Sequence, residues 1–200
     1  MSKSFRESVS LVFDTNFLIN YTNVQISENQ DKAKTWYNYY LNKYKSTSFC
    51  SEIVIAEFDV FNDFSVLEEN LKIKRIPFSK LESKLSAMFA QKIIKKSGNY
   101  KDFIFENLGI ANDKTTTNKN WQKIFEYVKD TLKDDLKILS SYVTHNIGTK
   151  KVFFTSDSGI FDLANQLDIE KNYNVKIVNY LTSEPGEDFS ELDLFKGEIE

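Results

Sequence analysis

The sequence is poor in the residues on which several kinds of site depend. Among 200 residues it has one cysteine, one histidine, two prolines and six glycines. The single cysteine, Cys50, excludes an internal disulfide and disfavours a zinc site made of cysteines, so we expect it to pack as a small buried residue. The glycines form neither a Walker loop nor a G-x-G-x-x-G turn. His145 has no identifiable catalytic partner and no nucleophile elbow accompanies it, so we expect it to be structural, near a helix end.

Long apolar runs are also missing. No stretch of about 18 apolar residues occurs, which excludes a transmembrane helix. The first residues lack the apolar centre of a signal peptide. We therefore expect a cytoplasmic protein that makes no use of a membrane.

Charge is distributed unevenly along the chain. The formal net charge is −3, from 26 basic and 29 acidic residues. Residues 184–200 hold seven of the acidic residues and one lysine, so the remainder has 25 basic and 22 acidic residues, a balance of +3. We predict a mildly basic body followed by an acidic C-terminal tail at 183–200. Such a body permits nucleic-acid binding without requiring it.

The order of apolar patterns predicts an α/β protein. Strands are expected at 9–13, 47–51, 71–76, 151–155 and 175–178, and helices at 17–21, 31–44, 52–67, 79–96, 121–144 and 160–167. This alternation is typical of a central parallel sheet covered by helices on both faces, a Rossmann-like three-layer α/β/α sandwich. We place one domain at 1–182, with a helical and loop insertion at 79–120.

Two helices are expected to be largely buried. In the helix at 31–44, Trp36, Tyr40 and Tyr44 recur at helical spacing, which favours a core stripe over a surface on which bases stack. The helix at 52–67 carries apolar residues around most of its circumference, Phe61 among them. We predict a polar loop from 22 to 31 between the first two helices.

Three carboxylates follow predicted strands. Asp14 ends the first strand, Glu57 lies in the first turns of the helix after the second strand, and Asp157 follows the strand at 151–155. The carboxyl ends of parallel strands are where ligands gather in such sheets. A buried negative charge there is costly unless a cation accompanies it. The alternative is that these residues are unrelated helix caps and surface acids.

A fourth carboxylate has two candidates, Asp134 and Asp135. The apolar stripe of the helix at 121–144 centres on one face, and Asp135 falls roughly 60° from that centre, against about 160° for Asp134. We therefore choose Asp135 for the site and expect Asp134 to be solvated and paired with a neighbouring lysine.

Four segments resemble the acidic motifs of the PIN domain family, in the same order. They are Phe-Asp14-Thr-Asn16, Ile-Val-Ile-Ala-Glu57, Asp135-Leu-Lys-Ile-Leu and Thr155-Ser-Asp157-Ser-Gly-Ile-Phe161. The resemblance spans about residues 9–180. It departs from the family in the bulky residues that follow Asp135 and in the length of the segment at 79–120. It implies a compact α/β/α nuclease whose acids bind Mg²⁺ or Mn²⁺ and cleave single-stranded RNA or, in some members, structured DNA, often as a toxin or in defence.

Chemistry agrees with that implication. Carboxylates are hard oxygen ligands that suit Mg²⁺ or Mn²⁺, and phosphodiester hydrolysis needs the charge neutralisation that such ions supply. We expect Asn16, Thr155 and Ser156 to orient the acids or a metal-bound water without binding the metal themselves.

A weaker signal is a set of basic and aromatic residues in and near the insertion. Lysines there could follow a phosphate backbone, and nearby aromatic rings could stack on bases, although such lysines more often form a solvated helix face. The basic residues are Lys84, Lys92, Lys95, Lys96 and Lys101 with Arg75 and Lys80, and the aromatic residues are Tyr100, Phe103 and Trp121.

The sequence thus predicts a metal-dependent endoribonuclease acting on single-stranded RNA. A structure-specific DNase of the same fold and a non-catalytic scaffold or regulatory domain remain as alternatives. A phosphatase of the haloacid-dehalogenase type is less favoured, since Asn16 stands where that chemistry uses a second aspartate. A homodimer and a regulatory protein partner both remain open.

Overall fold

The computed structural model describes residues 8–23, 25–96, 133–144 and 150–186. Five strands form one all-parallel sheet in the order β3-β2-β1-β4-β5. They are β1 (Ser8–Phe13), β2 (Lys45–Ser51), β3 (Lys74–Ile76), β4 (Lys151–Thr155) and β5 (Val175–Asn179). The predicted α/β class and parallel sheet are confirmed.

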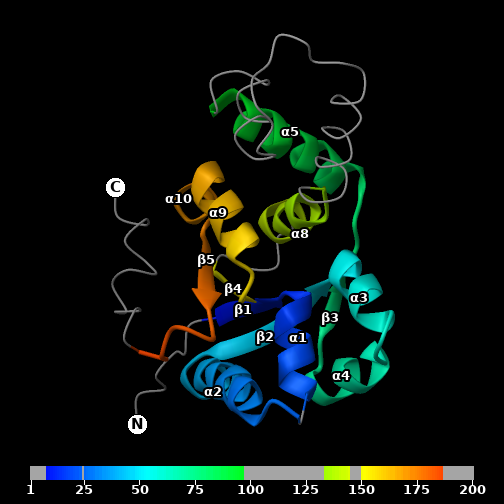
Figure 1. Cartoon of the computed structure of the whole chain (residues 1–200), viewed down its shortest axis with the longest axis vertical. Helices are drawn as coiled ribbons and strands as arrows, with labels where there is room; N and C mark the ends of the chain where they lie inside the picture. Colours follow the sequence, from blue (N-terminus) through cyan, green and yellow to red (C-terminus); the bar gives the residue numbers. More distant parts are fainter. Residues whose placement is uncertain (1–7, 24, 97–132, 145–149, 187–200) are drawn as a thin grey trace, which may run out of the picture.

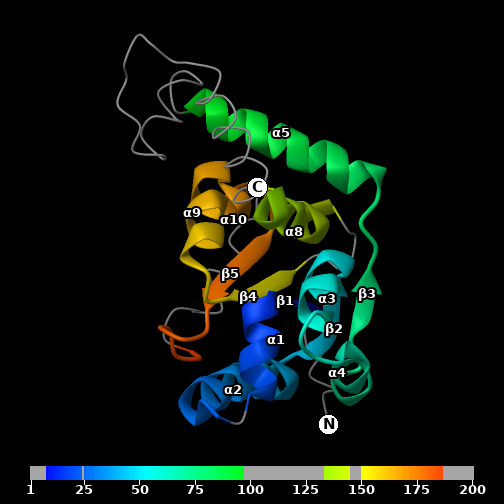
Figure 2. The ribbon, with the colours of Figure 1, turned by 45° about the vertical axis from the view of Figure 1, so that its right-hand side comes forward.

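Helices cover both faces of this sheet (Figures 1 and 2). One layer holds α1 (Thr15–Thr22), α2 (Ser27–Lys43), α3 (Glu52–Asp59) and α4 (Phe64–Leu71). The other holds α5 (Lys80–Lys96), α8 (Lys133–Thr144), α9 (Ser158–Leu167) and α10 (Ile169–Tyr173). The chain first runs outward from β1 to β3 and then returns to β4 and β5. Right-handed crossovers in the two directions place their helices on opposite faces.

The central strands are apolar because both of their faces are buried. Phe153 and Phe154 on β4 are both fully buried but point to opposite layers. The ring of Phe154 lies 5.1 Å from that of Phe17 on α1, whereas the ring of Phe153 lies 4.9 Å from that of Tyr142 on α8. The predicted aromatic stripe on α2 is likewise in the core, with Trp36 only 1% exposed.

The predicted single helix at 52–67 is wrong, since α3 and α4 are separate helices. Asp59 accepts a hydrogen bond from the backbone N–H of Phe64 at 2.8 Å, and Asp63 accepts one from Ser65 at 3.0 Å. These side chains cap α4 and compete with a continuous helix. Phe61, expected in the core, lies in the break and is 87% exposed.

The bounds of the other elements differ less from those predicted. The predicted loop at 22–31 is too long, because α2 begins at Ser27 with an exposed first turn that has no apolar periodicity. Helix α10 was not predicted, and the strand predicted at 71–76 is confined to Lys74–Ile76 because α4 extends to Leu71. The part of the insertion at 97–120, the first half of the helix predicted at 121–144, His145 and the tail beyond 186 lie outside the described residues. No helix within the described ranges is long and apolar enough to cross a membrane.

Candidate functional site

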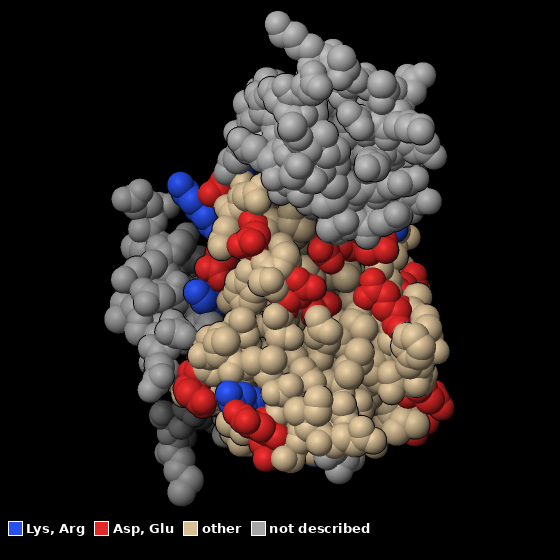
Figure 3. Space-filling model, viewed as in Figure 1, with Lys and Arg blue, Asp and Glu red and all other residues tan. Residues whose placement is uncertain are grey.

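The predicted acids lie at the carboxyl ends of the three central strands. The chain winds from β1 toward β3 in one direction and from β4 to β5 in the other, so the sheet reverses its winding between β1 and β4. In open α/β sheets the helices diverge at such a point and leave a crevice where ligands bind. Asp14 follows β1 and Asp157 follows β4, so these two carboxylates flank the reversal. Figure 3 shows acidic side chains gathered across the middle of this face.

Asp14 is the most deeply placed of the acids, with only 3% of its surface exposed. It is the N-cap of α1, since Oδ1 accepts a hydrogen bond from the backbone N–H of Thr15 at 2.8 Å. Oδ2 accepts another from Thr155 Oγ1 at 2.7 Å. The capping role and the site role predicted for Asp14 are therefore compatible, because carboxylate oxygens have further lone pairs.

Glu57 reaches the same rim from α3. Ser51, the last residue of β2, caps this helix by accepting a hydrogen bond from Ile53 N at 3.3 Å, which fixes where the helix begins. Glu57 lies in the second turn and is half-buried. Its Oε2 accepts a hydrogen bond from Thr15 Oγ1 at 2.5 Å, so the residue after Asp14 holds Glu57 beside Asp14.

Asp134 and Asp135 diverge as the helical-face argument predicts. Asp134 is exposed and its Oδ1 pairs with Lys137 Nζ at 2.6 Å. Asp135 is half-buried and faces the turn after β4, where its Oδ2 would lie 3.8 Å from a Cβ added to Gly159. Of these two aspartates, Asp135 is therefore the one that faces the rim.

Asp157 is the N-cap of α9 and lies beside Asp135. Its Oδ1 accepts hydrogen bonds from Gly159 N at 2.7 Å and Ile160 N at 3.4 Å. A Cβ on Gly159 would lie 3.1 Å from this oxygen. Because Gly159 has no side chain, this residue places no atoms between the carboxylates of Asp135 and Asp157. Sequence reasoning missed this role of Gly159, for which a single glycine after the aspartate is only a weak signal.

Burial raises the pKa of Asp14 to about 6. The hydrogen bonds from Thr155 and Thr15 favour the ionised form, but they do not offset the burial. The negative charges of Asp157 and Glu57 raise the pKa further. Desolvation and like charge both oppose ionisation here, which is the pattern of a site that accommodates a cation.

Burial also raises the pKa of Asp135, to about 7. The charges of Asp157, Asp14 and Glu57 act in the same direction, with a smaller contribution from Asp134. Asp14 and Asp135 thus lie within electrostatic range of each other and of both Glu57 and Asp157. They form one cluster of carboxylates and not four separate caps.

The cluster has donors that suit a hard divalent cation. In the described residues, no three acidic, histidine or cysteine side chains stand close enough together to hold one ion as they are placed. The four carboxylates are therefore neighbours rather than a formed coordination sphere. Their chemistry fits Mg²⁺ or Mn²⁺, because all four offer oxygen ligands and a bound cation would offset the burial and the mutual repulsion that raise two of their pKa values.

The residues predicted to support the acids have different roles from one another. Thr155 is fully buried and bridges the cluster, since Oγ1 donates to Asp14 and accepts from Asp157 N at 3.0 Å. The side chain of Asn16 is exposed and donates no hydrogen bond to the four carboxylates in the described part of the chain. Thr15, which sequence reasoning overlooked, makes that contact instead.

Ser156 is held by Tyr180 and not by an acid. Tyr180 Oη donates to the backbone carbonyl of Asn16 at 3.1 Å, and its oxygen accepts from the hydroxyl of Ser156 at 3.3 Å. Asn20 Nδ2 donates to the same hydroxyl at 2.7 Å. Tyr180 therefore joins the two loops that carry Asp14 and Asp157, a role for which the sequence gives no signal.

Two of the predicted basic residues are already engaged in internal contacts. Lys92 Nζ donates to the carbonyl of Leu167 at 2.9 Å, and Arg75 forms a two-pronged ion pair with Glu68 at 2.7–2.8 Å. Lys80 and Lys84 are exposed on α5. The side chains of Lys95 and Lys96, and the whole of Tyr100, Lys101, Phe103 and Trp121, lie outside the described residues.

Comparison with known proteins finds no matching family model and no matching curated protein. The functional assignment therefore depends on the carboxylate cluster and on the motifs that form it.

Proposed function

We propose that this chain is a metal-dependent nuclease of the PIN type that cleaves single-stranded RNA in the cytoplasm. The observation that carries the proposal is the convergence of Asp14, Glu57, Asp135 and Asp157 from four segments at the switch point of a parallel sheet. Burial raises the pKa of Asp14 and Asp135, and their neighbours raise it further. Titratable groups that gather together and have perturbed pKa values are candidates for a functional site.

The four carboxylates would hold Mg²⁺ or Mn²⁺. Such an ion, when bound, neutralises charge on a phosphodiester and makes water a better nucleophile near neutral pH. Thr155 keeps Asp14 oriented through a 2.7 Å hydrogen bond, and Thr15 does the same for Glu57 at 2.5 Å. Asp157 is held by the first amides of α9, so its free oxygen has a fixed direction.

A phosphatase that uses Asp14 as a nucleophile is a poorer fit. Both oxygens of Asp14 accept hydrogen bonds, and the residue is 3% exposed, whereas an attacking carboxylate must reach a phosphorus atom. The choice of RNA over DNA depends on the PIN resemblance, and a toxin or defence role has the same support.

Cleavage of end-labelled substrates tests the proposal. Single-stranded RNA, single-stranded DNA, a duplex and a flap would be incubated with Mg²⁺, Mn²⁺ or EDTA. We expect cleavage of single-stranded RNA that requires the metal and that Asp14→Asn and Asp157→Asn lower by at least about 100-fold, with unchanged circular dichroism. Cleavage of DNA alone would change the substrate class. No cleavage of any substrate, or cleavage that persists in both variants, would contradict the proposal.

A further inference from the structure

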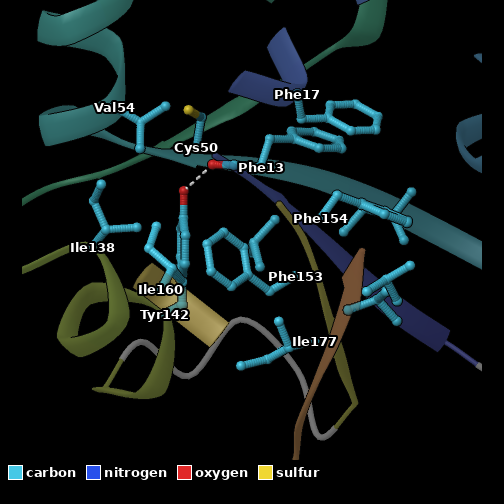
Figure 4. Close-up of a cluster of buried hydrophobic side chains, with 14 of the residues drawn as sticks. Phe13, Phe17, Cys50, Val54, Ile138, Tyr142, Phe153, Phe154, Ile160 and Ile177 are labelled. Atoms are coloured by element: carbon cyan, nitrogen blue, oxygen red, sulfur yellow. Dashed lines mark hydrogen bonds between the residues drawn. The ribbon is translucent and has the colours of Figure 1, made fainter. Parts of the chain in front are cut away.

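Tyr142 on α8 is fully buried, yet its hydroxyl is engaged in hydrogen bonds on two sides. Oη donates to the backbone carbonyl of Phe13, as Figure 4 shows, and accepts from the backbone N–H of Ser51 at 3.4 Å. A phenol has one donor and two acceptor positions, so these two contacts use its donor and one of its acceptors. A hydroxyl satisfied in this way has a fixed position.

The hydroxyl lies where the ends of β1 and β2 would otherwise pair directly. Ser10 N donates to Lys150 O at 2.8 Å and Asp14 N donates to Phe154 O at 3.0 Å, so the even-numbered residues of β1 bond to β4. The odd-numbered residues therefore face β2. The polar backbone groups of Phe13 are among them.

The register of β1 and β2 identifies the missing bond. Val12 is opposite Phe49, so Phe13 is opposite Cys50. In a parallel ladder the next bond would run from the N–H of Ser51 to the carbonyl of Phe13. Tyr142 Oη accepts from that N–H and donates to that carbonyl. A side-chain hydroxyl thus relays the last bond of the ladder at the rim where the carboxylates lie.

This relay connects the segments that carry three of the acids. Phe13 immediately precedes Asp14, and Ser51 caps the helix that carries Glu57. Asp135 precedes Tyr142 by seven residues, which is two helical turns and places both on the same face of α8. Ser51 Oγ also donates to Ser141 Oγ at 3.2 Å, which is a second contact between α8 and the end of β2.

We propose that Tyr142 is a positioning residue of the carboxylate cluster, which sets the separation of Asp14 and Glu57 and the depth of Asp135 between them. The inference rests on the proposed function, because it concerns how well the cluster binds a metal. Without the hydroxyl, the Ser51 N–H and the Phe13 carbonyl either lose their partner or close into a direct bond. Both outcomes move the acids relative to one another.

Titration calorimetry with Mn²⁺ alone tests the inference in the variant Tyr142→Phe. Tyr40→Phe is the matched control, because Tyr40 is also fully buried but its hydroxyl has no hydrogen-bond partner in the described residues. Each protein is titrated at a temperature where its unfolding curve shows it fully folded. We expect Tyr142→Phe to bind Mn²⁺ about tenfold more weakly, equivalent to about 1.4 kcal/mol, and Tyr40→Phe to bind as the unaltered protein does.

A purely structural tyrosine would give a different result. It would lower the melting temperature of Tyr142→Phe and leave the Mn²⁺ affinity of the folded protein unchanged, which would overturn the inference. If Tyr142→Phe does not fold, Ser141→Ala replaces it, with weaker binding expected and unaltered affinity contradicting the inference. Absence of Mn²⁺ binding by the unaltered protein would instead overturn the proposed function, and the inference with it.

Discussion

Asp14 and Asp135 are carboxyl groups placed where ionisation is unfavourable. Their pKa values, about 6 and about 7, lie well above the usual value near 3.8, first because they are buried and then because other acids surround them. A side chain of this kind seldom stabilises a fold, and its position is more readily explained by what it binds. Ionisation of these two residues therefore lowers the free energy of unfolding, and it places negative charge at the carboxyl ends of the strands.

The stability of the metal-free protein should decrease as pH rises through this range. The unfolded chain releases these protons near pH 4, whereas the folded chain keeps them until pH 6 to 7, so the folded state binds more protons in between. We expect Asp135→Asn to be more stable than the unaltered protein at pH 8, on the order of 1 kcal/mol or a few degrees in Tm, but not at pH 4. Thermal unfolding in EDTA measures this difference, and a difference independent of pH would contradict it.

The sequence was sufficient to place these acids but not to describe their support. Helical periodicity separated Asp135 from Asp134, because the apolar stripe of one helix carries that information. The contact from Thr15 to Glu57 and the space left by Gly159 were not predictable, since they depend on how separate elements meet. Such contacts are tertiary and have no local pattern.

Between elements, Glu82 connects α5 to α8. It forms a capping box with Ser79, whose backbone N–H donates to Glu82 Oε2 at 2.8 Å, and its Oε1 accepts from Thr144 Oγ1 on α8 at 2.7 Å. The side chain is 3% exposed. Burial opposes its ionisation, but the hydrogen bonds outweigh burial and lower its pKa to about 2. Glu82 thus fixes the start of α5 against the end of α8.

Glu82→Gln should destabilise the protein at neutral pH by about 1–3 kcal/mol. The reason is that the donors on Ser79 and Thr144 lose a buried, charged acceptor. The pKa of Glu82 is depressed in the folded state, so its stabilisation is present above about pH 4.5 and is lost as pH falls toward 2. The difference between the two proteins in chemical unfolding should therefore shrink below pH 4.5.

Glu28→Gln is the control for this change. Glu28 has 80% of its side chain exposed and pairs with Lys32 at 3.4 Å on the surface of α2, where ion pairs contribute little. If both variants lost stability equally, the connection assigned to Glu82 would be wrong.

Elements were predictable where hydrophobic periodicity decides them. The strands at 151–155 and 175–178 agree closely with β4 and β5, because each has a short run of mainly buried apolar residues. The break between α3 and α4 was missed, because Asp59 and Asp63 act as caps within a sequence whose apolar pattern continues. Side-chain capping competed with periodicity there and prevailed.

At the scale of the molecule, both edges of the sheet are protected. Strand β3 is three residues long and exposes Lys74 and Arg75. On β5 the backbone N–H of Ile177 donates to Glu170 Oε1 at 2.7 Å, so α10 covers that edge. Charged and covered edges oppose pairing with another strand. Any homodimer would be expected to use a different surface.

Divalent metal should stabilise the whole fold through the same rim. A ligand that binds only the folded state at 100 times its dissociation constant adds about 2.7 kcal/mol, which corresponds to several degrees in Tm for a chain of this size. We expect Mn²⁺ to raise the Tm of the unaltered protein and to have little effect on Asp14→Asn in differential scanning fluorimetry. An equal rise in both proteins would indicate binding elsewhere.

If one particular set of carboxylates acts together, the neighbours Asp134 and Asp135 must differ sharply in their importance for cleavage. The two residues are adjacent on α8, and Asn removes the same charge from each, but only Asp135 faces the cluster. The measurement is the single-turnover rate of single-stranded RNA cleavage in Mn²⁺ for both variants. We predict a loss of at least about 100-fold for Asp135→Asn and a change within about twofold for Asp134→Asn. Equal activity of the two variants, or a greater loss in Asp134→Asn, would show that Asp135 does not belong to a catalytic set of carboxylates.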